Sequence, residues 1–144
     1  MLLIFWISIP GHCGIHLAAG PQLLEECKKL GGIPTTVAKI TSGCTLPCKY
    51  IIHVTGPQAK NDICDFDALS KSYINCLNLA QENNIKEIAF YCISTGIFGF
   101  PKKESAQVAY KTIKEWLLNK HSFKQIIFDV FTYEDEMIYQ SLIE

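Results

Sequence analysis

The apolar positions of this 144-residue chain follow two periods, one typical of strands and one typical of helices. Short runs rich in β-branched and aromatic residues predict strands at 2–9, 35–41, 50–55, 87–93 and 125–131. Longer segments with apolar side chains at helical spacing predict helices at 15–30, 65–83, 102–119 and 133–142. The pair Gly20-Pro21 interrupts the first helical pattern and predicts a kink or a break into two short helices.

The order of these elements predicts an α/β domain. The last four elements alternate strand, helix, strand, helix, which is typical of parallel strands with helices on the faces of the sheet. The strands at 35–41 and 50–55 follow one another directly and could pair antiparallel, which would make the sheet mixed. No linker, internal repeat or low-complexity stretch divides the chain, so we expect a single domain over residues 1–144.

Charge narrows the classes of ligand. Thirteen basic residues, all of them lysines, stand against fourteen acidic residues and give a net charge of −1. A domain that binds nucleic acid through electrostatics would usually be strongly basic, so we expect no nucleic-acid partner. Because the chain has no arginine, a bound phosphate would be held by backbone N–H groups, hydroxyls or lysines rather than by an arginine fork.

The apolar and cysteine content bears on location. No apolar run approaches the roughly 20 residues that span a bilayer, so we expect no membrane segment. The apolar first ten residues lack a cationic region and a small-residue cleavage site, which favours a buried strand over a secretory signal. Seven cysteines, an odd number spread over the whole length, predict reduced thiols and a cytoplasmic protein.

The most informative segment follows the predicted strand at 87–93 and precedes the helix at 102–119. It reads Ser94-Thr95-Gly96-Ile97-Phe98-Gly99-Phe100-Pro101. Its glycines allow backbone N–H groups to approach a phosphate closely, and the start of the next helix adds partial positive charge. The segment lacks the lysine of a P-loop and the spacing of a dinucleotide-binding fingerprint. The open alternatives are a phosphate-binding loop and an ordinary turn between a strand and a helix.

A second candidate is a cluster of possible zinc ligands near the first helix. It consists of His12, Cys13 and His16, with Cys27 further along the chain. His12 and Cys13 are neighbours in the sequence, which makes it difficult for both to bind one tetrahedral ion. The alternative is that these residues form the start of a helix in which His16 has an ordinary hydrogen-bond partner. His53 lies in an apolar strand, which favours a core histidine over a catalytic base.

Taken together, these segments resemble the macrodomain family, whose members bind ADP-ribose. The residues that carry the resemblance are Gly14-Ile15-His16-Leu17-Ala18-Ala19-Gly20-Pro21 with Glu26-Cys27, residues 38–41, Leu46-Pro47, residues 50–57, 88–101 and 128–131, and Tyr139. The amino-acid sequence of residues 46–57 and 88–101 is most similar to that of the zinc-containing microbial macrodomains that hydrolyse protein-linked ADP-ribose.

The resemblance implies a three-layer α/β/α sandwich with a mixed, mostly parallel sheet. It implies that the segment from Ser94 to Phe100 wraps the diphosphate, that Phe98 lies near the distal ribose, and that Phe131 lies near the adenine. The implied partners are ADP-ribose or a mono-ADP-ribosylated protein. Zinc held by His12, Cys13 and His16 is the one possible cofactor.

The chain departs from the family pattern before residue 14. The family has an aspartate for the adenine, a strand that ends in a catalytic asparagine, and a glycine-rich loop with an aspartate. Residues 1–10 contain no asparagine or aspartate, and no cysteine precedes Cys13. We therefore expect an N-terminally shortened or divergent macrodomain, derived from an ADP-ribosyl hydrolase, in which the catalytic residues are unassigned. The alternatives are an inactive ADP-ribose reader and a degenerate domain without a ligand.

Overall fold

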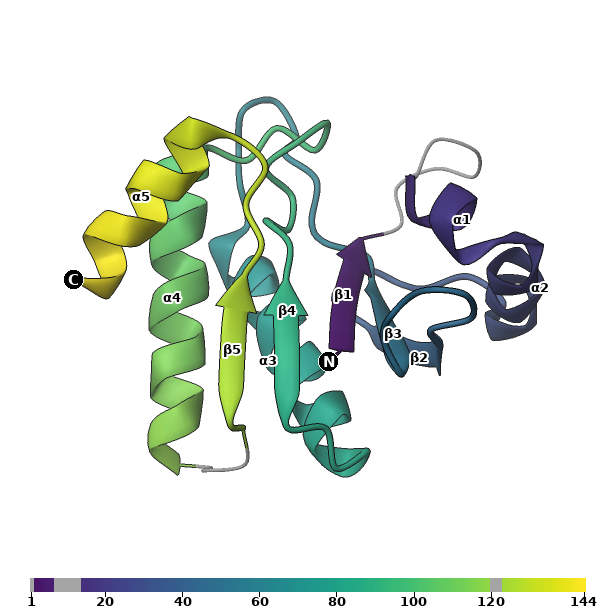
Figure 1. The fold of residues 1–144 in the computed structure, drawn as a ribbon. Helices are drawn as coiled ribbons and strands as arrows, with labels where there is room; N and C mark the ends of the chain where they lie inside the picture. Colours follow the sequence, from purple (N-terminus) through teal and green to yellow (C-terminus); the bar gives the residue numbers. More distant parts are fainter. Residues whose placement is uncertain (1, 7–13, 120–122) are drawn as a thin grey trace.

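The computed structural model describes residues 2–6, 14–119 and 123–144, with side chains from residue 15 onward (Figure 1). The elements are β1 (Leu2–Trp6), α1 (Gly14–Ala19), α2 (Pro21–Leu30), β2 (Ala38–Ser42), β3 (Tyr50–Val54), α3 (Phe66–Glu82), β4 (Glu87–Phe90), α4 (Lys102–Asn119), β5 (Gln125–Phe128) and α5 (Tyr133–Ile143). The predicted α/β class is confirmed. The predicted break at Gly20-Pro21 is confirmed too, because Gly20 has φ +80° and Pro21 opens α2.

The strands form one five-stranded sheet in the order β2-β3-β1-β4-β5. Strand β1 pairs in parallel with both β3 and β4, and β4 pairs in parallel with β5. The consecutive strands β2 and β3 pair antiparallel, as their adjacency in the sequence suggested. The parallel strands therefore end at the same edge of the sheet, and the segments that follow β3, β4 and β5 leave from that edge.

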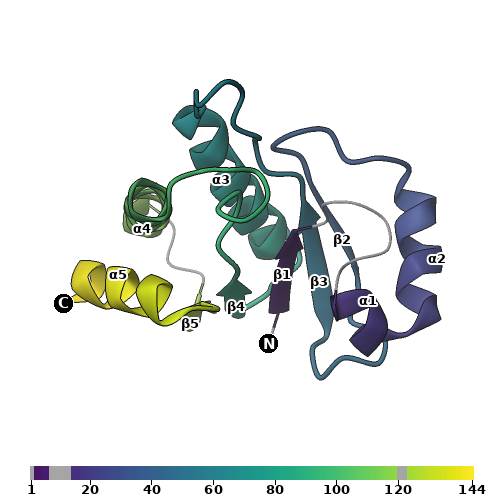
Figure 2. The ribbon, with the colours of Figure 1, turned by 90° about the horizontal axis from the view of Figure 1, so that it is seen from above.

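Alternate residues of β3 face two different sets of helices. On one face, Ile52 and Val54 belong to the main core with side chains of α3 and α4. On the other face, Ile51 packs with Ile15 and Ala19 of α1 and with Leu23 of α2. Figure 2 shows α3 and α4 on one side of the sheet and α1 and α2 beside β2 and β3.

Helix α5 lies beside β5, the outer strand at the end of the sheet away from β2 (Figure 2). The ring of Tyr139 stacks on Phe128 of β5, with ring centroids 4.6 Å apart. Thr132 and Asp135 form a capping box that begins α5, and Asp65 caps α3 by accepting from the N–H of Ala68 at 2.9 Å.

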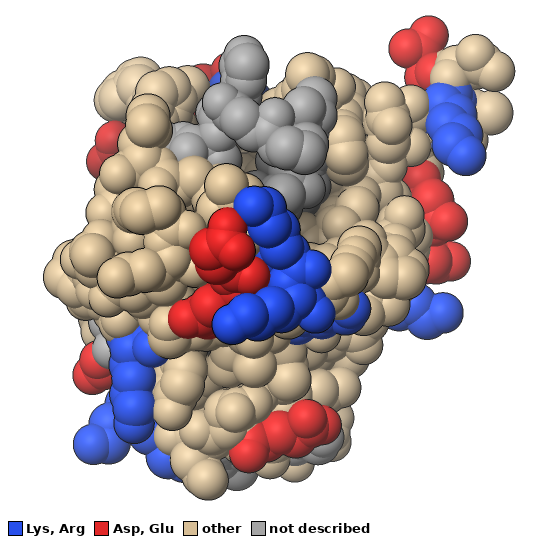
Figure 3. Space-filling view, turned by 90° about the vertical axis from the view of Figure 1, so that its right-hand side faces the viewer, with Lys and Arg blue, Asp and Glu red and all other residues tan. Residues whose placement is uncertain are grey.

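Charge on the described surface is mixed. Figure 3 shows lysine and acidic side chains next to one another on one face of the molecule. Lys28 and Glu25 of α2 form an exposed ion pair, with Nζ 2.9 Å from Oε1. None of the described helices is both long and apolar enough to cross a membrane. None of the described cysteines is paired in a disulfide.

His53 of β3 is fully buried, and Thr41 of β2 is its diagonal neighbour on the same face of the sheet. Its Nε2 lies 2.8 Å from the Thr41 hydroxyl, which in turn donates to the carbonyl of Ser42. The other ring nitrogen, Nδ1, is buried and has no hydrogen-bond partner among the described residues. Burial first, and the neighbouring His16 second, lower the pKa of His53 to about 4. The placement fits a core histidine.

This pKa predicts a loss of stability in acid. Between pH 6.5 and 4 the unfolded chain binds a proton at His53 that the folded chain does not, so the free energy of unfolding falls as pH falls. The expected loss is up to about 3 kcal/mol. Urea unfolding of the His53→Gln variant over this range should show a flatter dependence on pH than the wild type. Thr41→Val keeps the imidazole and should keep the slope, and an equal slope in His53→Gln would contradict the assignment.

Candidate functional site

The predicted phosphate loop leaves the sheet at the edge where the parallel strands end. It follows β4 and runs into α4, and Figure 1 shows it at the upper edge of the sheet, where the arrowheads of β1, β4 and β5 point. The sequence predicted a strand as far as residue 93, but β4 ends at Phe90. The difference arises because Ile93 leaves the ladder and its N–H donates instead to the hydroxyl of Tyr73.

Hydrogen bonds within the loop close it into a compact turn. The N–H of Phe100 donates to the carbonyl of Ser94 at 3.1 Å, and the N–H of Gly99 donates to the carbonyl of Gly96 at 3.0 Å. Ser94 and Gly99 have φ values of +65° and +76°, in the left-handed region. Two left-handed residues and two closing hydrogen bonds therefore define the path of the backbone.

Two consecutive backbone donors remain in the middle of this turn. Residues 93 and 94 form a turn that closes from Cys92 to Thr95, and within the described part of the chain the N–H groups of Gly96 and Ile97 have no hydrogen-bond partner. A Cβ atom built on Gly96 would meet none of the described residues within 4 Å, so the described structure leaves open space beside the turn at this point. Successive unpaired N–H groups beside open space can bind an anion such as a phosphate.

A second segment, residues 56–59 after β3, packs directly against the loop. A Cβ atom on Gly56 would lie 2.3 Å from the Ser94 hydroxyl, so only glycine allows this approach. The N–H of Ala59 donates to the carbonyl of Phe98 at 2.9 Å. The sequence marked Gly56-Pro57 as part of the segment 50–57 that carries the family resemblance, but it did not indicate a contact with the loop. The position of this pair after a second parallel strand was the signal that could have assigned it to the site.

The side chains of the loop divide between surface and core. Ile97 is 70% exposed, whereas Phe98 is half-buried. Phe100 is buried and packs edge-on against Phe66 at 5.4 Å, which directs its side chain into the core and away from a ligand. The buried Ser94 hydroxyl has no partner among the described residues. The structure thus brings Ser94, Thr95, Gly96, Ile97, Phe98, Gly99 and Phe100 into one turn.

Phe131 lies at the same edge of the sheet, after β5, and is 93% exposed. The segment that holds it is tied to the end of the loop by Lys102. The ammonium of Lys102 lies 3.1 Å from the Thr132 hydroxyl and 3.3 Å from the carboxylate of Asp135. An exposed ring at this edge is suited to stacking on a flat ligand group.

The zinc prediction cannot be followed through all its residues. His12 and Cys13 lie outside the described residues. His16 is half-buried, and its Nδ1 is buried without a partner in the described structure. Within residues 14–119 and 123–144 no three histidine, cysteine or acidic side chains are placed to hold a metal ion. The free Nδ1 of His16 could supply one metal ligand, but a zinc site needs several. The described residues therefore do not form a zinc site.

The thiol of Cys92, two residues before the loop in the sequence, is not an activated nucleophile. Burial, with a smaller contribution from the charge of Asp135, raises the pKa of Cys92 to about 11. Burial likewise raises the pKa of Tyr73 above its usual range. Both groups stay protonated at neutral pH, so the chemistry that the described loop supports directly is binding of an anion.

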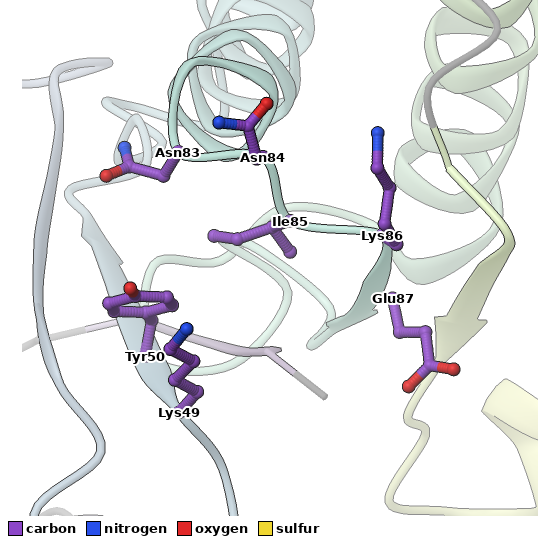
Figure 4. A pocket seen from close by; sticks show the side chains of 7 residues that line it. All are labelled: Lys49, Tyr50, Asn83, Asn84, Ile85, Lys86 and Glu87. Atoms are coloured by element: carbon purple, nitrogen blue, oxygen red, sulfur yellow. The ribbon is translucent and has the colours of Figure 1, made fainter.

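A cavity of about 180 Å³ lies at the end of the sheet opposite to the candidate loop (Figure 4). Its lining side chains come from the start of β3 and from the connection between α3 and β4, and include Lys49, Tyr50 and Glu87. The Lys49 ammonium lies over the ring of Tyr50, 5.2 Å from its centroid. This cavity adjoins the amino ends of β3 and β4, away from the edge where the candidate loop lies.

The family model of the macro domain matches residues 12–109, and the chain belongs to the macrodomain family. It is 50% identical over 129 residues to the human ADP-ribose glycohydrolase MACROD2, covering 88% of this chain and 30% of that protein. It is 43% identical over 139 residues to a protein-ADP-ribose hydrolase of Treponema medium, covering 90% of this chain and 52% of the relative. The chain thus spans about a third to a half of these relatives.

The fold matches a solved Trypanosoma brucei macrodomain in complex with ADP-ribose. The TM-score is 0.92 at 27% sequence identity, and the match covers 99% of this chain and 63% of the other. The family predicted from the sequence is therefore confirmed. The ligand contacts of the individual loop residues and of Phe131 stay predictions.

The contact at Gly56 predicts a stability effect. Gly56→Ala should lower the free energy of unfolding by about 1–3 kcal/mol, because its methyl group would overlap the Ser94 hydroxyl and the Ile93 side chain. Gly96→Ala, where a methyl group meets open space, should change stability little. Urea unfolding of both variants measures the difference. Equal stabilities would contradict the close packing of the two segments.

Proposed function

We propose that this chain is an ADP-ribose-binding macrodomain in which the turn at residues 94–100 holds the diphosphate. The observation that supports the proposal is the pair of successive N–H groups at Gly96 and Ile97, unpaired among the described residues, in a turn whose ends are closed by hydrogen bonds. Backbone donors suit a chain without arginine, because they supply positive partial charge without a guanidinium. The names of the relatives, which include ADP-ribose hydrolases, support the same ligand.

The resemblance to the family suggests where the distal ribose and the adenine of the ligand would lie. Phe98, half-buried beside the turn, would adjoin the distal ribose, and the exposed ring of Phe131 would adjoin the adenine. Both residues leave the sheet at the edge where the turn lies. We also propose the complete family architecture, a three-layer sandwich with a mostly parallel sheet, and a cytoplasmic location, which the absence of disulfides among the described cysteines supports.

The second candidate function is hydrolysis of the bond between ADP-ribose and a protein side chain. The names of the relatives favour it. Water would attack the anomeric carbon of the distal ribose, the bond to the side chain would break, and ADP-ribose and the free side chain would leave. The turn would hold the ligand in place for this attack. A base or a zinc ion at His12, Cys13 and His16 would belong to this candidate alone.

Calorimetric titration of the purified chain with ADP-ribose, with and without added zinc, tests the proposal. We expect micromolar binding that does not require zinc. Release of ADP-ribose from a mono-ADP-ribosylated protein would then test the hydrolase candidate. Absence of binding by a sample with a cooperative unfolding transition would overturn the proposed function.

Gly96→Glu places a carboxylate where the diphosphate is expected. Open space beside Gly96 should let the variant fold, while repulsion between like charges should weaken ADP-ribose binding about 100-fold or more. Gly32→Glu is the matched control, because a Cβ atom at Gly32 also meets nothing within 4 Å. Gly32 lies beyond α2, so this control should bind normally. Normal binding by Gly96→Glu would contradict the placement of the diphosphate.

A further inference from the structure

Lys102, the first residue of α4, joins the two segments between which the proposed function divides the ligand. One is the turn at residues 94–100, which precedes α4, and the other is the segment with Phe131, which precedes α5. We propose that Lys102 is a positioning residue that holds the Phe131 ring at a fixed separation from the turn, so that one ligand contacts both. The inference rests on the proposed function and assigns to Lys102 a part of the affinity for the adenine end of ADP-ribose.

The two segments leave the sheet side by side but are distant along the chain. The turn follows β4 and Phe131 follows β5, and these strands pair in parallel. The N–H of Asp129 donates to the carbonyl of Phe90 at 2.8 Å, just past the last residue of β5. Beyond this bond the ladder no longer sets the separation of the two segments. Lys102 joins them again at the points where α4 and α5 begin.

The ammonium of Lys102 has three acceptors in the first turn of α5. Its Nζ lies 3.1 Å from the Thr132 hydroxyl, 3.0 Å from the carboxylate of Glu134 and 3.3 Å from that of Asp135. Three acceptors match the three donors of an ammonium. Two of them are negatively charged and balance its positive charge. Lys102 therefore acts on the ligand through the position of this segment, and not as a cation that binds the diphosphate.

Asp135 distinguishes this contact from an ordinary surface ion pair. Its side chain is 10% exposed, whereas that of Glu134 is 69% exposed. One carboxylate oxygen accepts from the Thr132 hydroxyl at 2.6 Å, and the other lies next to Lys102. Burial acts to raise the pKa of Asp135, but the hydrogen bond from Thr132 and the charge of Lys102 lower it overall, so the carboxylate stays charged. A nearly buried carboxylate that loses its counter-ion is destabilised, which favours rearrangement of the first turn of α5.

Phe131 moves with this turn. It directly precedes Thr132, the N-cap of α5, and its ring is 93% exposed, so few contacts of its own hold the ring. The middle of α5 is held independently of Lys102, because Tyr139 stacks on Phe128 with ring centroids 4.6 Å apart. Loss of the ammonium should therefore change the separation between the ring and the turn at residues 94–100 and leave the rest of α5 in place.

A double-mutant cycle tests the inference by calorimetric titration with ADP-ribose. Lys102→Met removes the ammonium and keeps a long side chain, and it should weaken binding about tenfold. Phe131→Ala removes the ring. In the Phe131→Ala background, Lys102→Met should cause no further loss, because the ammonium acts through the ring.

Two further variants complete the cycle. Lys103→Met is the matched control, since it makes the same substitution at the next position of α4, which is exposed, and it should bind ADP-ribose as the wild type does. Lys102→Gln keeps a donor for Thr132 and lacks the charge. It should weaken binding only where Phe131 is present, and it takes the place of Lys102→Met if that variant does not fold. Thermal unfolding checks that each variant folds.

The possible failures are distinguishable. Wild-type affinity in Lys102→Met overturns the inference. An equal loss in both backgrounds also overturns it, because the ammonium would then contact the ligand itself or its removal would distort the turn. Wild-type affinity in Phe131→Ala overturns the inference and leaves the placement of the diphosphate intact. Failure of the folded wild type to bind ADP-ribose overturns the proposed function, and the role of Lys102 with it.

Discussion

The site depends on the close approach of two chain segments at Gly56 and Ser94. The segments leave the sheet from β3 and β4, which do not pair with each other and are held apart by β1. Because Gly56 has no side chain, the segment after β3 can lie directly against the Ser94 hydroxyl. The hydrogen bond from Ala59 to Phe98 then fixes the two segments together. The shape of the turn follows from this contact.

Strands and helices were well predicted because their signals are local. Amphipathic spacing located α3 and α4 to within a residue or two, and Gly20-Pro21 marked the break between α1 and α2. Strand ends were predicted less well, because apolar runs continue past the last ladder pair. Residues 91–93 are as apolar as β4, but the N–H of Ile93 is bound by the Tyr73 hydroxyl, a partner distant in sequence.

The sequence predicted the part of the candidate site that one continuous segment forms, but not the part that arises from packing between segments. The glycines and hydroxyls of residues 94–101 identified the turn, since their conformational and hydrogen-bonding properties are intrinsic. The role of residues 56–59 was not visible, because it arises from packing between segments some 40 residues apart. Phe98 and Phe100 look equivalent in the sequence, but one is half-buried and the other lies in the core.

The central position of β1 has a consequence for how the chain folds. Residues 2–6 pair with residues 50–54 on one side, and residues 2–4 pair with residues 88–90 on the other. Two large loops must therefore close before the middle of the sheet exists, and each closure loses chain entropy before its contacts are made. Topologies with such distant strand pairs fold slowly. Until β1 is inserted, β3 and β4 each present an open edge to neighbouring chains, so refolding competes with association at high protein concentration.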